Sequence, residues 1–213
     1  MTPKQPTIGI IGAGKLGITL GQLLRQAGLP VLISSSRPAA ENRLTVNFLV
    51  PGAVAADTEQ LAKDADIIIL ALPLGKFRQI PADLVDGKLV IDGMNYWWEV
   101  DGPRTDILPD DQSSSQAVQD WFSGARVVKG FSHMGYHHLR DSARPAGAPD
   151  RKAIAVASDR ADDAATVSQL IDQAGFDPLL LPNLAAGRVL EPGQPGFGVN
   201  VGRDELAQLV MNA

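Results

Sequence analysis

The stretch that decides the fold is Ile8-Gly9-Ile10-Ile11-Gly12-Ala13-Gly14-Lys15-Leu16-Gly17. It runs from a short apolar strand straight into a glycine pattern of the form G-x-G-x-x-G, and an amphipathic helical pattern opens at Lys15. In such a unit the first glycine allows the tight turn, the second lets the backbone approach a pyrophosphate, and the third lets the helix pack on the strand. The pattern therefore predicts a dinucleotide-binding turn formed by Gly12, Ala13, Gly14, Lys15, Leu16 and Gly17.

Short apolar runs alternate with helical patterns along the rest of the chain. Most of the runs are uninterrupted by polar residues, as in parallel strands that are covered on both faces. The alternation predicts an α/β fold of the Rossmann type, with a doubly wound, mainly parallel sheet. The predicted strands are Thr7–Ile11, Val31–Ser34, Ala53–Ala56, Ile67–Leu72, Leu89–Asp92, Arg126–Phe131, Ala153–Ala157 and Pro178–Leu181. The predicted helices are Lys15–Ala27, Thr58–Ala65, Ser115–Ser123, Asp162–Ala174 and Asp204–Met211.

We expect two parts in the chain. Residues 1–182 are predicted to form the Rossmann dinucleotide-binding domain. Residues 183–213 are too few to fold alone and contain a loop rich in glycine and proline, Ala185–Gly198. They are predicted to form a short C-terminal extension packed on the same domain.

Composition excludes several classes of protein. The sequence has no cysteine, so disulfides, thiolate metal sites and cysteine nucleophiles are absent. Its net charge of -5 and its lack of any basic block argue against binding to nucleic acid. The longest apolar run, Ile67–Leu72, is far shorter than the roughly 20 residues of a membrane helix. We therefore expect a cytoplasmic protein that binds neither nucleic acid nor a membrane.

The end of the second predicted strand indicates which dinucleotide is bound. Sites specific for NAD usually place an acidic residue there, for the 2′-hydroxyl of the ribose. This chain instead has Ser34, Ser35, Ser36 and Arg37. Hydroxyl groups and a guanidinium suit a 2′-phosphate, because arginine binds phosphate through two parallel hydrogen bonds. The sequence thus predicts NADP(H) as the cofactor.

Three further strand ends should surround the nicotinamide and its redox partner, since ligands of this fold cross the carboxyl ends of the strands. Leu72, Pro73, Met94 and Asn95 are predicted to contact the cofactor. Aromatic, thioether and imidazole side chains favour a planar ring as the partner. The residues predicted to bind it are Tyr96, Trp97, Ser132, His133 and Met134. Trp97 and Trp98 fit either a stacking platform for the ring or a lid packed on the sheet edge.

No metal ligand and no catalytic side chain is predicted. His133, His137 and His138 are close in sequence, but Gly135 interrupts the segment and no HExxH pattern accompanies it. Lys129 lies within a predicted strand and is interpreted as a structural residue. No arrangement of Ser, His and Asp or of paired carboxylates is apparent from the spacing.

These motifs resemble those of the NADP oxidoreductases that depend on the deazaflavin coenzyme F-420. The resemblance covers most of the chain. It depends most on the segments 91–97, 128–137 and 144–149. It implies a single Rossmann domain that carries both ligands, with direct transfer of hydride between the nicotinamide and the deazaflavin. It also implies that Ser36 and Arg37 bind the 2′-phosphate and that Ser132, His133 and Met134 face the second ring.

Some alternatives stay open. A flavin or a small organic acceptor fits the same place as the deazaflavin. A keto or imine reductase is the second enzyme hypothesis, although such enzymes append a large helical domain for which too little chain remains. A redox-sensing module that binds NADP(H) without turnover is the non-enzymatic hypothesis. The direction of the reaction and the presence of a homodimer are not determined by the sequence.

Overall fold

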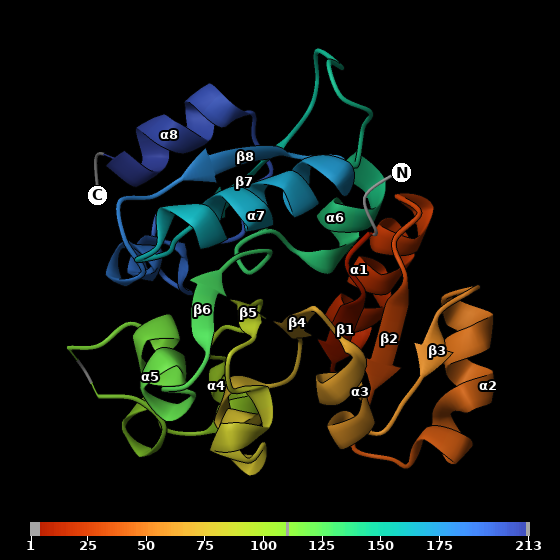
Figure 1. The fold of residues 1–213 in the computed structure, drawn as a ribbon. Helices are drawn as coiled ribbons and strands as arrows, with labels where there is room; N and C mark the ends of the chain where they lie inside the picture. The colour runs from red at the N-terminus through yellow and green to blue at the C-terminus, as the bar shows by residue number, and fades with distance from the viewer. Residues whose placement is uncertain (1–4, 110, 212–213) are drawn as a thin grey trace.

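The computed structural model describes residues 5–109 and 111–211. Its centre is a six-stranded sheet of order β3-β2-β1-β4-β5-β6 (Figure 1), in which every neighbouring pair is parallel. The strands are β1 (Ile8–Ile11), β2 (Val31–Ser34), β3 (Val54–Ala55), β4 (Ile67–Leu70), β5 (Leu89–Asp92) and β6 (Arg126–Lys129). The prediction of a Rossmann-type, doubly wound parallel sheet is confirmed. The order reverses between β1 and β4, where this fold binds its ligands.

Alternate side chains of the central strands enter two different cores, which explains their uninterrupted apolar sequences. Ile8 and Ile10 of β1 belong to one core cluster, together with Ile67 and Ile69 of β4. Ile68 and Leu70 of β4 belong to the other. Because both faces of the sheet are covered, every position of these strands is apolar or glycine.

Helices cover both faces of the sheet. The helices are α1 (Lys15–Gln26), α2 (Ala39–Leu49), α3 (Thr58–Asp64), α4 (Trp98–Asp101), α5 (Ser114–Trp121), α6 (Tyr136–Ser142), α7 (Ala161–Gln173) and α8 (Arg203–Met211). The 3-10 helices are η1 (Leu74–Gln79), η2 (Ala82–Val85), η3 (Arg104–Asp106) and η4 (Ala185–Leu190).

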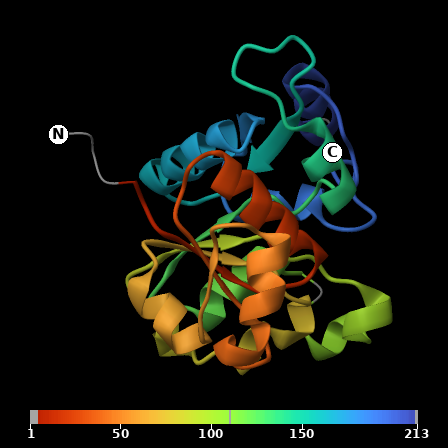
Figure 2. The same cartoon turned by 90° about the vertical axis from the view of Figure 1, so that its right-hand side faces the viewer.

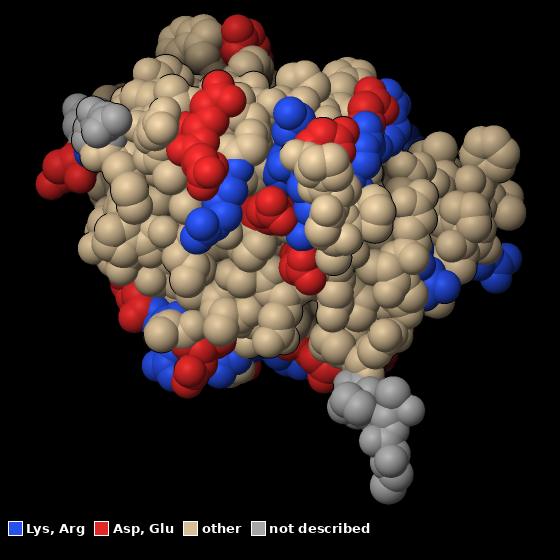
Figure 3. Space-filling model, turned by 90° about the horizontal axis from the view of Figure 1, so that it is seen from above, with Lys and Arg blue, Asp and Glu red and all other residues tan. Residues whose placement is uncertain are grey.

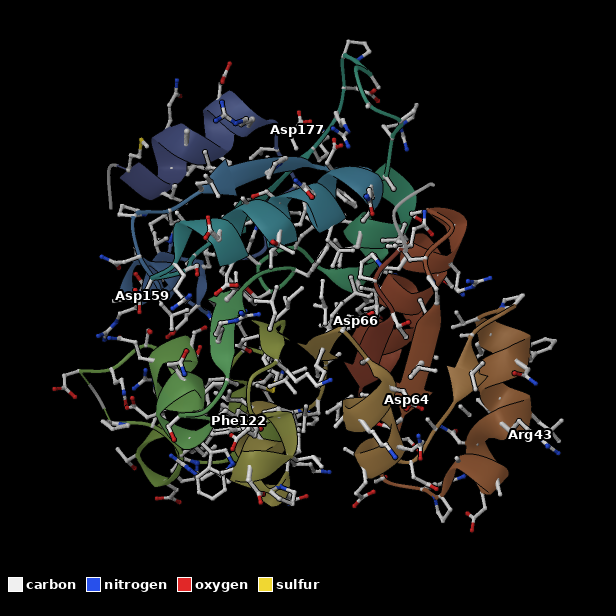
Figure 4. The ribbon with its side chains drawn as sticks, viewed as in Figure 1. Arg43, Asp64, Asp66, Phe122, Asp159 and Asp177 are labelled. Atoms are coloured by element: carbon white, nitrogen blue, oxygen red, sulfur yellow. The ribbon has the colours of Figure 1, made fainter. Side chains whose placement is uncertain are left out.

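The sequence interpretation did not include α2, α4 and α6. Helix α2 buries only Val46, while Leu44 and Phe48 are exposed and Arg43 points outward (Figure 4). It therefore lacks the apolar stripe by which helices are recognised in a sequence. Helix α4 has only four residues and buries none of them, and helix α6 has seven and buries only Leu139.

The last two strands, β7 (Ala153–Val156) and β8 (Asp177–Leu180), correct the expectation of one sheet. They form a separate parallel pair, and β7 meets β6 only through an antiparallel bridge between Lys129 and Ala157. Because β7 runs opposite to β6 where they touch, it cannot continue the parallel ladder. With α7 and α8, this pair forms a layer above the six-stranded sheet (Figures 1 and 2).

The segment after β8 returns to this upper layer. Leu190, Leu206 and Val210 share a third core cluster with Ala153 and Leu179. At η4, the backbone N–H of Leu184 donates to Asp159 Oδ1 over 2.9 Å (Figure 4). The division at residue 182 stays a prediction, and residues 1–4, 110, 212 and 213 of its ranges lie outside those described.

The surface of the molecule carries both positively and negatively charged side chains. In the view from above, basic and acidic side chains are interspersed over the upper face (Figure 3). Within the described ranges, no helix is both long and apolar enough to cross a membrane.

Candidate dinucleotide site

The glycine turn after β1 depends on two close backbone approaches. Gly12 has φ +121°, and a Cβ there would overlap the carbonyl oxygen of Ala71 at the end of β4. A Cβ on Gly17 would overlap the carbonyl oxygen of Gly12. Side chains are thus excluded at both positions, one by the neighbouring strand and the other by the turn itself.

Gly14 differs from these two glycines. Its backbone has φ −79° and ψ −172°, which any residue adopts, and a Cβ there would meet no atom within 4 Å. It precedes α1, whose first N–H groups have no partner within the helix. No side chain caps this terminus, and its first turn contains no acidic residue. The open space at Gly14 therefore lies at a helix terminus suited to an anion.

A cavity of about 580 Å³ extends from the glycine turn across the ends of β2 and β4. Eight of the predicted residues line it, namely Gly12, Ala13, Gly14, Ser35, Ser36, Arg37, Leu72 and Pro73. Polar residues that the sequence analysis did not select also line it, namely Asn42, Thr45, Thr58, Glu59, Lys76 and Gln79. Ile80, Pro81 and Leu84 supply an apolar wall. These come from α2, α3, η1 and η2 or lie beside them, and no local motif links them to the glycine turn.

The serines before Arg37 have different positions. Ser34 is buried, and its Oγ accepts a hydrogen bond from the hydroxyl of Thr58 over 3.2 Å, so it does not line the cavity. Ser35 Oγ accepts from the N–H of Arg37 over 3.1 Å, which fixes the turn that presents this arginine. Arg37 is exposed, and within the described ranges no carboxylate forms an ion pair with it. Its guanidinium is thus available to an anionic ligand.

Three residues predicted to contact a ligand at the other strand ends are instead buried. Met94, His133 and Met134 are 2%, 1% and 3% exposed. Met94 packs in the core shared with β4, and Met134 packs in the core shared with α1. In this structure these side chains offer almost no surface to a ligand, and their predicted contacts stay predictions.

His133 is held between the two layers of the fold. Its Nε2 accepts a hydrogen bond from the N–H of Ala155 in β7 over 3.0 Å, which requires that nitrogen to be unprotonated. Burial, and to a smaller extent the positive charge of Lys129, lower the pKa of His133 from 6.5 to about 4, although a hydrogen bond to the backbone of Gly196 opposes both. The neutral imidazole thus joins the two sheets, and its predicted contact with a redox ring stays a prediction.

Four further predicted residues follow β5 or β6 in sequence and do not line the cavity, namely Asn95, Tyr96, Trp97 and Ser132. Asn95 Nδ2 donates to the carbonyl oxygen of Ser132 over 2.9 Å, so the ends of β5 and β6 are connected. Asn95 Oδ1 and Ser132 Oγ are buried atoms without a partner in the part of the chain that the structure describes. Tyr96 donates its hydroxyl to the carbonyl oxygen of Gly102 over 2.6 Å. Trp97 is 48% exposed, and its ring lies 6.0 Å from that of Phe197, so it packs partly on the C-terminal segment.

Helix α1 also contacts α6. Lys15 Nζ lies 5.3 Å from the centre of the Tyr136 ring, within the range of a cation–π contact. The ring of His137 lies 3.9 Å from the same ring. Leu16 lies beside the core and is 3.6 Å from the position of a Cβ on Gly93. Within residues 5–109 and 111–211, no three His, Asp or Glu side chains gather as a metal site.

Comparison with known proteins bears on this geometry. Residues 7–96, which contain the glycine turn and the residues that line the cavity, match the model of the family described as NADP oxidoreductase coenzyme F420-dependent. This confirms the resemblance expected from the motifs. The matched stretch contains β1 to β5 and ends at Tyr96, shortly after β5.

Relatives share the fold over longer stretches. A hypothetical protein from Sinorhizobium meliloti is 26% identical, with a TM-score of 0.79, over 94% of this chain and 97% of that one. A candidate F420-dependent NADP reductase from Arthrobacter sp. FB24 is 21% identical, with a TM-score of 0.72, over 93% and 100%. The metalloreductase STEAP3 of Rattus norvegicus is 24% identical over 89% of this chain, which spans 36% of that protein.

Proposed function

We propose that this chain, related as it is to NADP-dependent oxidoreductases, binds NADP(H) across the strand ends and transfers hydride to a planar redox partner. The observation that carries the proposal is the cavity that connects the open terminus of α1 at Gly14 with the exposed guanidinium of Arg37. One end suits the pyrophosphate and the other suits the 2′-phosphate.

The adenosine half would lie within this cavity. The N–H groups at the start of α1 bind the pyrophosphate, and Ser36 and Arg37 bind the 2′-phosphate. Ile80, Pro81 and Leu84 form an apolar wall against which a flat base can pack. The residues present therefore fit this half of the cofactor.

The nicotinamide half would cross from Pro73 toward the ends of β5 and β6. Bound NADPH supplies a hydride from C4 of its ring to the acceptor ring, and a proton from solvent completes the reduction. The protein would hold the two rings in place, and positioning alone accounts for much of the rate of such a reaction. His133 is buried and neutral, and we assign no proton transfer to it.

Arg37→Ala is expected to reduce the affinity for NADPH by about 1–3 kcal/mol, the range for losing a charge-assisted hydrogen bond. The affinity for NADH should change little, because NADH lacks the 2′-phosphate. Isothermal titration of both cofactors measures the difference. Equal losses for NADPH and NADH would contradict the placement of the 2′-phosphate.

Glu59→Gln is the matched control in the same cavity. A carboxylate suits a ribose 2′-hydroxyl, whereas it repels a 2′-phosphate. We expect this variant to bind NADPH at least as tightly as the wild type. A selective loss of NADPH in Glu59→Gln would show that our assignment of the two ends is wrong.

The acceptor in our proposal is a deazaflavin or a flavin. The matched family model is named for coenzyme F420, and a half-exposed tryptophan, Trp97, follows β5. We expect deuterium at C4 of NADPH to appear on a deazaflavin or flavin acceptor, as measured by mass spectrometry. Reduction of small keto acids or imines alone would identify a different class of reductase. Tight binding of NADPH with no transfer to any acceptor would favour a sensor.

A further inference from the structure

A charged pair lies fully buried at the carboxyl ends of β5 and β6. Lys129 and Asp92 are both inaccessible to solvent, and Lys129 Nζ lies 3.5 Å from Asp92 Oδ2. Lys129 also donates to the carbonyl oxygen of Met94 and to Ser114 Oγ, over 3.2 Å in each case. Every described hydrogen bond of Lys129 goes to another group of this protein, so its ammonium is not placed to donate a proton to a ligand.

Asp92 also contacts the main chain of Met94. Its Oδ1 accepts from the backbone N–H of Met94 over 2.9 Å, and its Oδ2 accepts from the hydroxyl of Ser115 over 2.6 Å. The pair therefore holds both the N–H and the C=O of Met94. The backbone conformation of the segment that leaves β5 is fixed by two opposite charges.

Hydrogen bonds connect the Lys129–Asp92 pair to α5 and, through α5, to the segment after η4. Ser114 and Ser115 are the first residues of α5. The N–H of Ser114 donates to Glu191 Oε1 over 2.6 Å, just after η4, and Glu191 pairs with Arg104 at 3.7 Å. Residue 94 is thus held against β6 and α5, and α5 is itself anchored to the C-terminal segment through Glu191.

We infer that Lys129 and Asp92 are positioning residues, which hold the Met94–Asn95 segment in the conformation that the nicotinamide half of the cofactor requires. The inference rests on the proposed function. Asn95 follows directly and donates to the carbonyl of Ser132, so it joins the segments that leave β5 and β6, where we place the nicotinamide half. The cavity in which we place the adenosine half is lined by residues that the pair does not touch.

Stability by itself gives little reason for this pair. Burying two charges is costly, and an apolar pair of similar volume often stabilises a core as well or better. The sheet around them is apolar, with Ile91 and Val128 as immediate neighbours of Asp92 and Lys129 in sequence. The two charged side chains add specific hydrogen bonds to the main-chain N–H and C=O of Met94.

The test compares two ligands that share the adenosine half. 2′,5′-ADP carries the 2′-phosphate and the 5′-phosphate but no nicotinamide. In Lys129→Met we expect the affinity for NADPH to fall about tenfold, as for the loss of a well-placed hydrogen bond to the segment. The affinity for 2′,5′-ADP should stay within about twofold of the wild-type value, and titration separates a twofold change from a tenfold one.

A second variant covers the case in which Lys129→Met does not fold, since it leaves Asp92 as an unpaired buried charge. The double variant Asp92→Asn/Lys129→Met removes both charges and keeps the volume, and we expect the same split between the two ligands. Lys88→Met is the matched control, because Lys88 also donates to a carbonyl, that of Ala65 over 2.7 Å, at the opposite end of β5. It should change neither affinity.

Each result has one meaning. A selective loss of NADPH in a folded variant supports the positioning role. Equal losses of affinity for NADPH and 2′,5′-ADP, or no loss for either, would overturn the positioning role. The proposed function would stay intact in that case, because the wild-type protein still binds both ligands. A wild-type protein that binds neither ligand would overturn the proposed function and this inference together.

Discussion

Gly14→Val is expected to abolish binding of NADPH while the protein stays folded. The backbone at Gly14 has φ −79°, so a branched residue adopts it without strain, and a Cβ would meet no protein atom within 4 Å. The space that valine would fill is the space in front of the N–H groups of α1, where we place the pyrophosphate. Calorimetry with NADPH and the melting temperature together measure the two parts of this expectation.

Gly135→Val is a matched control for this substitution. Gly135 also precedes a helix, α6, with φ −61° and ψ 143°, and a Cβ there would meet no atom within 4 Å. It does not line the cavity, so NADPH binding should be retained. Gly17→Val should instead impair folding, because its side chain would overlap the carbonyl of Gly12. Retained binding in a folded Gly14→Val protein would show that the pyrophosphate lies elsewhere.

Acidification is expected to destabilise the fold through His133. The pKa of His133 is about 4 in the folded protein and 6.5 in its unfolded reference, so below pH 6.5 the unfolded state binds a proton that the folded state excludes. The stabilising contribution is present above pH 6.5 and is lost as the pH falls toward 4. The loss reaches about 3 kcal/mol, since each pKa unit corresponds to about 1.4 kcal/mol.

Urea unfolding at several values between pH 7 and pH 4.5 measures this dependence. His133→Asn should reduce the steepness of the fall, because asparagine offers Ala155 an acceptor that does not titrate in this range. His137→Asn, at an exposed position, should keep the wild-type steepness. The same slope in His133→Asn and the wild type would contradict the assignment, whatever the contribution of the carboxylates to acid unfolding.

The sequence was informative wherever a feature depends on residues adjacent in the chain. The glycine turn could be predicted because Gly12, Gly14 and Gly17 act within one strand–turn–helix unit. The strands of the main sheet could be predicted from their short apolar runs, which are uninterrupted in β1 and β4 because both faces of these two strands are buried. The cavity could be predicted along this unit, at the residues that follow β2 and at the end of β4, but not at α2, α3, η1 and η2.

By itself, then, the sequence determined the strand–turn–helix unit of the glycine turn, the fold class and the residues to which we assign the cofactor's phosphates. The tertiary structure alone decided the opposite wall of the cavity, the separate sheet of β7 and β8, and the burial of His133. It alone paired Lys129 with Asp92, which lie 37 positions apart. The physical reason is that local periodicity reports which face of an element is buried, while the partner of a side chain depends on how distant elements pack. In the sequence, His133 and Lys129 have the pattern of residues at a strand end. In the folded protein, His133 accepts a hydrogen bond from Ala155 of β7 and so links the two sheets. Lys129 is buried and donates to the main-chain carbonyl of Met94.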